Sequence, residues 1–259
     1  MSKLIVGNLK MNLLTIAERD RYLESFEREL KNFPENKAKI ILCPPFVHLE
    51  KFSEKFKMEN VSIGAQNIFW EERGSFTGEI SSLMVKNIGC KYVILGHSER
   101  RKYFSESGEI INAKIKAALQ DNLTPIVCIG ESQAERNDGD TAEIIVAQIN
   151  QSLKDVPISK ITEVVFAYEP VWAVGSDAIP TGNDILEVRI TIKKTLVEKY
   201  GASAAEKVRI LYGGSVNSKN VAQVCVEPQM DGVLVGRESL IPNEFLKIVE
   251  IINAIRNNE

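Results

Sequence analysis

The stretch V-V-F-A-Y-E-P-V-W-A-V-G-S occupies residues 164–176 and indicates both the fold and the chemistry of the chain. Its first four residues, 164–167, form a short apolar run typical of a buried strand in a parallel sheet. Glu169 follows where that strand should end, and Pro170 holds it at a stiff junction before the loop 171–181. This arrangement suits a general base beneath a mobile segment, because proton abstraction from carbon needs a positioned base and exclusion of water. A polar residue that merely closes a strand is the alternative.

Similar short apolar runs recur along the whole chain and predict eight strands. They lie at residues 4–7, 40–43, 61–64, 92–95, 125–129, 164–167, 208–211 and 232–235. Helical patterns with apolar residues three or four apart lie between them. The first helix is expected to begin at a capping box of Thr15 and Glu18 and to end at Pro34. Its apolar face would be Leu23, Phe26, Leu30 and Phe33, and other stripes fall within 110–119, 144–153, 185–200 and 245–255.

The alternation of strand and helix predicts a parallel sheet covered by helices, and eight such units close a sheet into a barrel. An open doubly wound sheet is the rival fold. It normally has a G-x-G-x-x-G turn after its first strand, whereas residues 7–12 read G-N-L-K-M-N. No linker, low-complexity segment or charge block interrupts the 259 residues. We therefore expect one domain over residues 1–259, a single (β/α)8 TIM barrel of the α/β class.

Composition argues against several classes of protein. The 32 Lys and Arg residues nearly balance 35 Asp and Glu residues, and the net charge of -3 indicates no basic surface for nucleic acid or an anionic membrane. No apolar run resembles a secretion signal or a membrane span, so we expect a cytoplasmic protein. Four cysteines stand far apart, and three of them lie in or beside strand candidates. Cys43, Cys90, Cys128 and Cys225 are therefore expected to be reduced core thiols.

Residues that follow successive strands of such a barrel share one face, where polar groups can converge. Asn8 and Lys10 follow the first strand, and Lys10 could supply a fixed cation there, with a solvated lysine as the alternative. His97 follows the fourth strand at the start of a predicted helix. The partial positive charge of a helix N-terminus favours a neutral ring, which can donate a hydrogen bond to a carbonyl. His48 has no such setting and is interpreted as structural or exposed.

Two turns that contain glycine follow the last two predicted strands, Y-G-G-S-V-N at 212–217 and G-R-E-S at 236–239. Backbone N–H groups in such turns can approach an anion, and loops after strands seven and eight form the phosphate site typical of these barrels. A phosphorylated ligand is indicated, although either turn alone could be a plain tight turn. The motifs H-E-x-x-H and G-x-x-x-x-G-K-[ST] are absent, so no metal or nucleotide cofactor is expected.

Eight blocks of sequence together resemble the triosephosphate isomerase family over essentially the whole chain. They are 7–12 (G-N-L-K-M-N), 64–67 (G-A-Q-N), 77–81 (T-G-E-I-S), 93–101 (V-I-L-G-H-S-E-R-R), 128–131 (C-I-G-E), 167–175 (A-Y-E-P-V-W-A-V-G), 211–217 (L-Y-G-G-S-V-N) and 231–236 (D-G-V-L-V-G). The resemblance implies interconversion of dihydroxyacetone phosphate and D-glyceraldehyde 3-phosphate, in glycolysis and gluconeogenesis, without cofactor or metal. Glu169 would be the base, neutral His97 would polarise the carbonyl and shuttle protons, and Lys10 with Asn8 would stabilise the enediolate.

The resemblance also implies a phosphate site, a lid and a dimer. Backbone N–H groups of Gly175, Ser215, Gly236 and Arg237 would hold the phosphate. Tyr212 and Ser215 would latch the closed lid, and Trp172 and Glu131 would steady its hinge. A homodimer is expected through the loop Gln66 to Glu79, which carries the large apolar residues Phe69 and Trp70.

Three positions depart from the family pattern. Leu9 stands where tryptophan is usual, S-D-A-I-P at 176–180 replaces a more usual G-T-G-K type of lid, and Arg237 replaces a glycine. One hypothesis is that Arg237 pairs with Asp177 or with the phosphate, and the alternative is two unrelated surface charges. Three other functions use similar groups and stay open at this point: isomerisation of a four-carbon ketose phosphate, a Schiff-base aldolase, and a non-catalytic phosphate-binding barrel.

Overall fold

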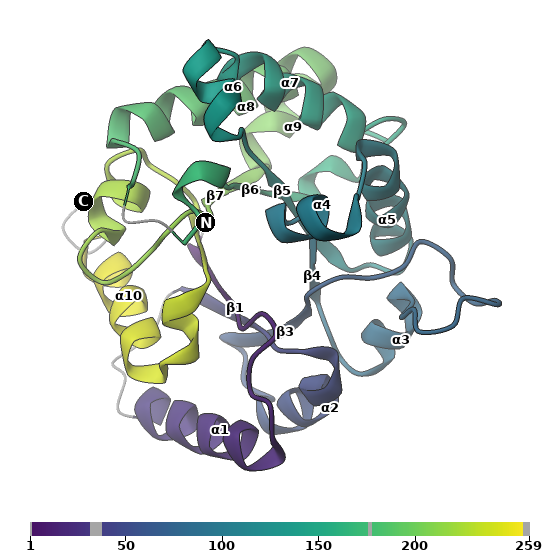
Figure 1. Cartoon of the computed structure of the whole chain (residues 1–259), viewed down its shortest axis with the longest axis vertical. Helices are drawn as coiled ribbons and strands as arrows, with labels where there is room; N and C mark the ends of the chain where they lie inside the picture. The colour runs from purple at the N-terminus through teal and green to yellow at the C-terminus, as the bar shows by residue number, and fades with distance from the viewer. Residues whose placement is uncertain (1, 32–37, 176–177, 256–259) are drawn as a thin grey trace.

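The computed structural model describes residues 2–31, 38–175 and 178–255, and its eight strands form a closed barrel (Figure 1). The strands are β1 (Leu4–Asn8), β2 (Lys39–Cys43), β3 (Val61–Ala65), β4 (Tyr92–Leu95), β5 (Thr124–Ile129), β6 (Val165–Tyr168), β7 (Arg209–Tyr212) and β8 (Gly232–Val235). Each strand is parallel to its neighbours, and Leu4 of β1 pairs both with Lys39 of β2 and with Gly232 of β8. The predicted (β/α)8 barrel is confirmed.

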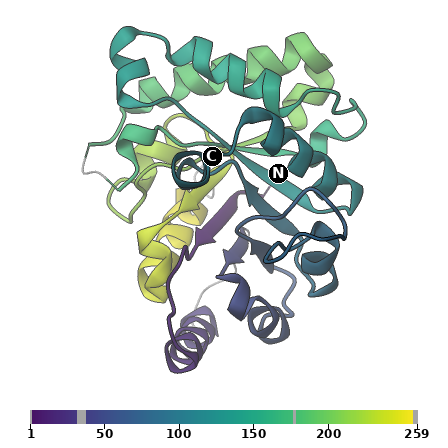
Figure 2. The same ribbon diagram turned by 45° about the vertical axis from the view of Figure 1, so that its right-hand side comes forward.

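Helices surround the barrel on its outside, as both views show (Figures 1 and 2). They are α1 (Ile16–Lys31), α2 (Phe46–Lys55), α3 (Ser82–Asn87), α4 (Ser98–Phe104), α5 (Gly108–Gln120), α6 (Gln133–Asp138), α7 (Thr141–Ser152), α8 (Gly182–Tyr200), α9 (Ala202–Lys207) and α10 (Pro242–Ile255). Short turns of helix, η1 (Ile161–Glu163), η2 (Val171–Ala173), η3 (Ala222–Val226) and η4 (Arg237–Leu240), complete the connections. None of the helices within the described residues is long and apolar enough to span a bilayer.

Alternation along the strands divides the apolar residues into two layers. Leu4 and Val6 belong to a cluster inside the barrel, whereas Ile5 between them packs outward beneath the helices. The inner cluster consists of Leu4, Val6, Ile41, Cys43, Tyr92, Ile94, Ile126, Cys128, Val165, Ala167, Leu211 and Leu234. Because both faces of every strand are buried, the strands read as continuous apolar runs rather than alternating ones.

Several predicted strand ends differ from the structure by one residue, and two differences at the ends of elements have a clear local cause. The sixth strand begins at Val165 rather than at residue 164, because Val164 closes the preceding turn with a hydrogen bond to the Ile161 carbonyl. At the start of α1, the Thr15 hydroxyl accepts from the Glu18 N–H as a capping box requires. The Glu18 carboxylate, however, accepts from Leu14 rather than from Thr15, so the reciprocal bond of the box is displaced by one residue.

The first predicted helix face is otherwise as expected. Leu23, Phe26 and Leu30 are buried, while Phe33 and Pro34 lie outside the described residues. Phe26 packs edge-on against Phe56 at 5.4 Å between ring centroids, a favourable geometry for two aromatic rings.

His48 is structural, because it is buried and its Nε2 lies 2.6 Å from the Leu13 carbonyl oxygen.

All four cysteines are free and buried, as predicted. Burial raises the pKa of Cys43, Cys90 and Cys225, to about 12 for the latter two. Burial, and then the neighbouring Glu169 carboxylate, raise the pKa of Cys128. Each thiol is therefore almost fully protonated near neutral pH, and a protonated thiol is a poor nucleophile.

We expect none of the four thiols to react with a disulfide reagent in the native protein at about pH 8, because only about one thiol in ten thousand is ionised four units below its pKa. After unfolding in denaturant, all four thiols should react with the reagent at the rate of free cysteine. The measurement is the number of thiols labelled before and after unfolding, and rapid labelling of any one in the native state would contradict the burial described above.

Candidate active site

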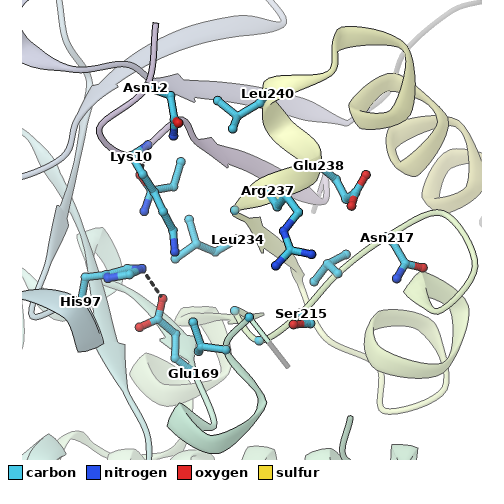
Figure 3. Close-up of a pocket in the computed structure, with 17 residues that line it drawn as sticks. Lys10, Asn12, His97, Glu169, Ser215, Asn217, Leu234, Arg237, Glu238 and Leu240 are labelled. Atoms are coloured by element: carbon cyan, nitrogen blue, oxygen red, sulfur yellow. Dashed lines mark hydrogen bonds and ion pairs between the residues drawn. The ribbon is translucent and has the colours of Figure 1, made fainter. Parts of the chain in front are cut away.

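A cavity of about 360 Å³ opens at the C-terminal ends of the strands (Figure 3). All eight residues predicted from the sequence line it: Asn8, Lys10, His97, Glu169, Gly175, Ser215, Gly236 and Arg237. They come from the ends of β1, β4, β6, β7 and β8 and from the segment after η2. Asn12, Asn217 and Glu238 also line the cavity and were not predicted. In the described part of the chain, no group of three or more His, Cys, Asp and Glu side chains is placed to hold a metal ion.

Glu169 faces the barrel axis because of its position in the strand alternation. Val165 and Ala167 belong to the inner cluster, so Glu169, two residues further along, points the same way above them. Its N–H donates to the Ile129 carbonyl at 2.7 Å, which continues the ladder with β5. The side chain is only 2% exposed, and its Oε2 lies 3.3 Å from the Ser98 nitrogen. The strand thus delivers a nearly buried carboxylate to the base of the cavity.

Two glycines make room for this carboxylate. A Cβ atom at Gly130 would lie 1.8 Å from the Glu169 carbonyl oxygen, an overlap with the backbone that no side-chain movement could relieve. At Gly213 a Cβ would lie 2.7 Å from Glu169 Cγ, against the side chain itself. Residues 130 and 213 must therefore lack a side chain if Glu169 is to keep its place.

The hydrogen bonds of His97 identify its tautomer. His97 is the N-cap of α4, and its Nδ1 accepts the backbone N–H of Glu99 at 3.2 Å. An accepting Nδ1 carries no proton, so the neutral ring has its proton on Nε2. Nε2 lies 3.2 Å from Glu169 Oε1. The structure thus directs an N–H donor toward the candidate base, in agreement with the predicted neutral ring.

Lys10 is held in an unusual backbone conformation. Its φ of 51° lies in the left-handed region, which costs a non-glycine residue about 1–2 kcal/mol. The Lys10 N–H donates to Asn8 Oδ1 at 3.0 Å, and Gln66 Nε2 donates to the Lys10 carbonyl at 2.9 Å. These two bonds fix the turn, and the Lys10 Nζ then pairs with Glu99 Oε1 at 2.5 Å. The role of Gln66 was not predicted.

Glu131 ties the base of the lid segment to the barrel. It is fully buried, and its Oε1 accepts from Tyr168 at 3.1 Å and from Trp172 Nε1 at 2.8 Å. Burial, and then the charge of Glu131, raise the pKa of Tyr168, so its hydroxyl remains a donor. The expectation that Glu131 and Trp172 steady the hinge stays a prediction, which these contacts support.

Arg136 of α6 reaches both ends of the lid segment. Its guanidinium lies 4.6 Å from the centre of the Trp172 ring and 3.1 Å from Asp184 Oδ1, at the start of α8. Thr181 and Asp184 form a capping box at that helix. Residues 170–175 and 178–184 are therefore each attached to a rigid neighbour, while Ser176 and Asp177 lie outside the described residues.

The other end of the cavity is formed by the turns after β7 and β8. Ser215 Oγ donates to the Ala173 carbonyl at 2.7 Å, which joins the seventh loop to η2. The Tyr212 hydroxyl is buried and has no hydrogen-bond partner among the described residues. The expected pairing of Arg237 with Asp177 also involves a residue that the structure does not describe. The latch predicted for Tyr212 and Ser215 stays a prediction.

Comparison with known proteins identifies the family. The family described as triosephosphate isomerase matches residues 3–252. The triosephosphate isomerase of Thermoanaerobacter sp. is 44% identical over 246 residues, 95% of this chain and 98% of the relative. That of Caldanaerobacter subterraneus subsp. tengcongensis is 45% identical over 95% of this chain and 98% of its own length. The chain belongs to the triosephosphate isomerase family. Like others of that family it is an aldose–ketose isomerase, so the activity expected from the sequence is confirmed.

One departure from the triosephosphate isomerase pattern is explained by the fold. Leu9, where the family usually has tryptophan, is completely buried and belongs to the outer apolar cluster. Its side chain therefore packs beneath the first loop and does not line the cavity. This agrees with the expectation that the change affects packing more than chemistry.

We expect Gly213→Ala to lower turnover by about tenfold or more, because the added methyl group displaces the Glu169 side chain, and misplacement of about 1 Å can cost about a hundredfold in rate. The melting temperature should change little, since the position lies beside the open cavity. Steady-state kinetics and thermal unfolding of the same preparation measure both quantities. Unchanged turnover would show that the carboxylate does not need the space at residue 213.

Proposed function

We propose that this cavity interconverts D-glyceraldehyde 3-phosphate and dihydroxyacetone phosphate with Glu169 as the base. The observation that carries the proposal is the contact of 3.2 Å between Glu169 Oε1 and the Nε2–H of a neutral His97. A carboxylate and an N–H donor on one side of the cavity can act together, the carboxylate on a proton of the carbon next to a carbonyl and the N–H on the oxygen of that carbonyl. Membership of the triosephosphate isomerase family supports the choice of substrate.

The reaction moves one proton between adjacent carbons. Glu169 removes a proton from the carbon next to the carbonyl, and the electron pair moves to the carbonyl oxygen and forms an enediolate. The His97 Nε2–H group exchanges its contact with Glu169 for one with that oxygen, to which it donates a hydrogen bond. His97 then relays a proton between the two oxygens of the enediolate. Lys10 and the Asn8 amide stabilise the negative charge as it develops. Glu169 then returns the proton to the neighbouring carbon, so no redox partner or cofactor is consumed.

The ion pair of Lys10 argues against the alternative of a Schiff-base aldolase. Lys10 Nζ lies 2.5 Å from Glu99 Oε1, and this contact is made by the protonated ammonium. An imine requires the free amine as nucleophile. Lys10 is therefore placed as a fixed cation, the role that electrostatic stabilisation of an enediolate requires.

Backbone N–H groups of Gly175, Ser215, Gly236 and Arg237 hold the phosphate in this proposal. All four residues line the cavity, and Figure 3 shows Arg237 across it from His97. The segment 170–181 then covers the ligand and excludes water. Cytoplasmic glycolysis and gluconeogenesis are the setting we propose, a placement supported by the family and by the balanced charge of the chain.

We expect Glu169→Gln to lose several orders of magnitude in turnover, because an amide cannot accept a proton from carbon. The fold and the binding of a phosphate-bearing inhibitor should persist, since the amide has nearly the same shape. Glu24→Gln on the exposed face of α1 makes the same chemical change far from the cavity and serves as the control. Turnover near that of the control would refute the proposed base.

A homodimer through the loop Gln66 to Glu79 is the second part of the proposal. The loop projects from the barrel between β3 and α3 (Figure 1). Phe69 packs against Trp70 and Phe76 with tilted rings, at centroid distances of 4.0 Å and 4.7 Å, yet Trp70 and Phe76 remain 37% and 42% exposed. An exposed aromatic cluster of this kind is typical of an interface. Since Gln66 of the same loop supports the Lys10 carbonyl, association would also steady the catalytic turn.

Sedimentation equilibrium at micromolar concentration should give about twice the chain mass of 28.9 kDa. Phe76→Asp should shift the protein toward monomer, because a charge at the centre of an apolar contact must be desolvated. Arg73→Asp, in the same loop but 84% exposed at its side chain, is the matched control and should remain dimeric. A fully active monomer at that concentration would contradict the proposal.

A further inference from the structure

Arg237 places a second cation in the cavity. The residue follows Gly236 at the end of β8 and begins η4. Figure 3 shows its guanidinium pointing into the cavity from the β8 side, facing the side from which His97 and Glu169 enter. The residue is exposed, and its side chain makes no hydrogen bond or ion pair with any described residue.

The other cationic groups around the cavity are already engaged. Lys10 pairs with Glu99, and the buried Arg101 donates to the Gly96 carbonyl at 2.8 Å and to the Cys128 carbonyl at 3.1 Å. Glu238 lines the cavity next to Arg237, but the two side chains form no ion pair. Among the described residues that line the cavity, the guanidinium is therefore the cation with no carboxylate partner.

The position of this group matches the part of the cavity that is lined by the turns after β7 and β8. Lys10 also reaches the turn after β8, since a Cβ atom on Gly236 would lie 3.8 Å from its Nζ, but that ammonium pairs with Glu99. A phosphate ester carries nearly two negative charges near neutral pH. A planar guanidinium can donate two parallel hydrogen bonds to phosphate oxygens, and such bonds are about twice as strong as neutral ones.

We propose that the guanidinium of Arg237 binds the phosphate group of the triose phosphate directly, in addition to the backbone N–H groups of the two turns. Arg237 thereby becomes a residue that determines affinity for the anionic end of the substrate. The inference rests on the proposed function for the identity of the substrate. Because the family usually has glycine here, the contact is a property of this chain rather than of the family.

The contact predicts a particular dependence on salt. Arg237 is exposed, so its attraction for an approaching anion is screened as ionic strength rises. Binding of inorganic phosphate should weaken more steeply with salt in the wild type than in a variant without this charge. Backbone N–H groups carry no net charge and contribute little to such a slope.

The test compares Arg237→Gln with Lys219→Gln. Lys219 is exposed in the loop after β7 and does not line the cavity, so its substitution removes one positive charge from the same rim without touching the ligand. The dissociation constant of inorganic phosphate is measured by calorimetry at about 20 mM and about 200 mM salt. We expect Arg237→Gln to weaken phosphate binding by about tenfold at the lower salt, which corresponds to about 1.4 kcal/mol. Lys219→Gln should change it by less than about twofold.

Kinetics with D-glyceraldehyde 3-phosphate show whether the same contact serves the substrate. KM should rise in Arg237→Gln by a factor similar to that for inorganic phosphate, while kcat falls less, because the lost contact lies away from the reacting carbons. Arg237→Lys should fall between the wild type and Arg237→Gln, since an ammonium keeps the charge but not the planar pair of donors.

Three results would overturn the inference. They are unchanged phosphate affinity in Arg237→Gln, weaker inorganic phosphate binding with an unchanged KM, and equal losses in Arg237→Gln and Lys219→Gln. If Arg237→Gln fails to fold, Arg237→Lys decides in its place, and wild-type phosphate affinity there would refute the bidentate contact. Phosphate affinity is read without turnover, so failure of the proposed mechanism in Glu169→Gln is a separate result.

Discussion

Closure of eight parallel strands imposes a strict alternation of side chains, and the cavity depends on it. The inner layer is filled by residues such as Val6, Ile94 and Ala167, which leave no space along the barrel axis. The position two residues beyond the last inner residue is the first that can face open space. At β1 and β6 that position holds Asn8 and Glu169, and at β7 and β8 it holds a glycine. The same geometry that packs the core thus determines which strand ends carry functional groups and which leave room for a ligand.

Two pairs of polar groups lie side by side in the cavity. Lys10 pairs with Glu99, and His97 Nε2 lies 3.2 Å from Glu169 Oε1, so neither the candidate base nor Lys10 is left without a partner. In the proposed reaction the substrate would exchange these partners: its carbonyl oxygen would replace Glu169 beside His97, and its developing charge would compete with Glu99 for Lys10. Equivalent contacts would then be broken and formed, so in this proposal much of the binding free energy comes from the phosphate end.

The sequence alone predicts the strand positions and the residues at their ends, because apolar runs and their spacing are local properties. Glu169, His97 and Lys10 were found in this way, and the family resemblance supplied Gly175 and the roles of the phosphate turns. The partners of these groups could not be found from local pattern. Lys10 pairs with a residue 89 positions away and receives a hydrogen bond from Gln66, 56 positions away. Such contacts depend on side-chain rotamers and on how loops meet above the barrel. Strand β6 begins one residue late for a related reason, since the turn at η1 competes for Val164.

Arg136 has a consequence for how the lid segment can vary. One side of its guanidinium covers Trp172, and its other nitrogen pairs with Asp184, so the two ends of the segment share a single support on α6. Both ends are thereby held near the same point of α6. A change in the sequence between them leaves the two contacts intact, whereas an inserted or deleted residue changes the length of chain that must join the same two points. The segment is therefore free to diverge in sequence, as S-D-A-I-P at 176–180 already shows, but it is constrained in length.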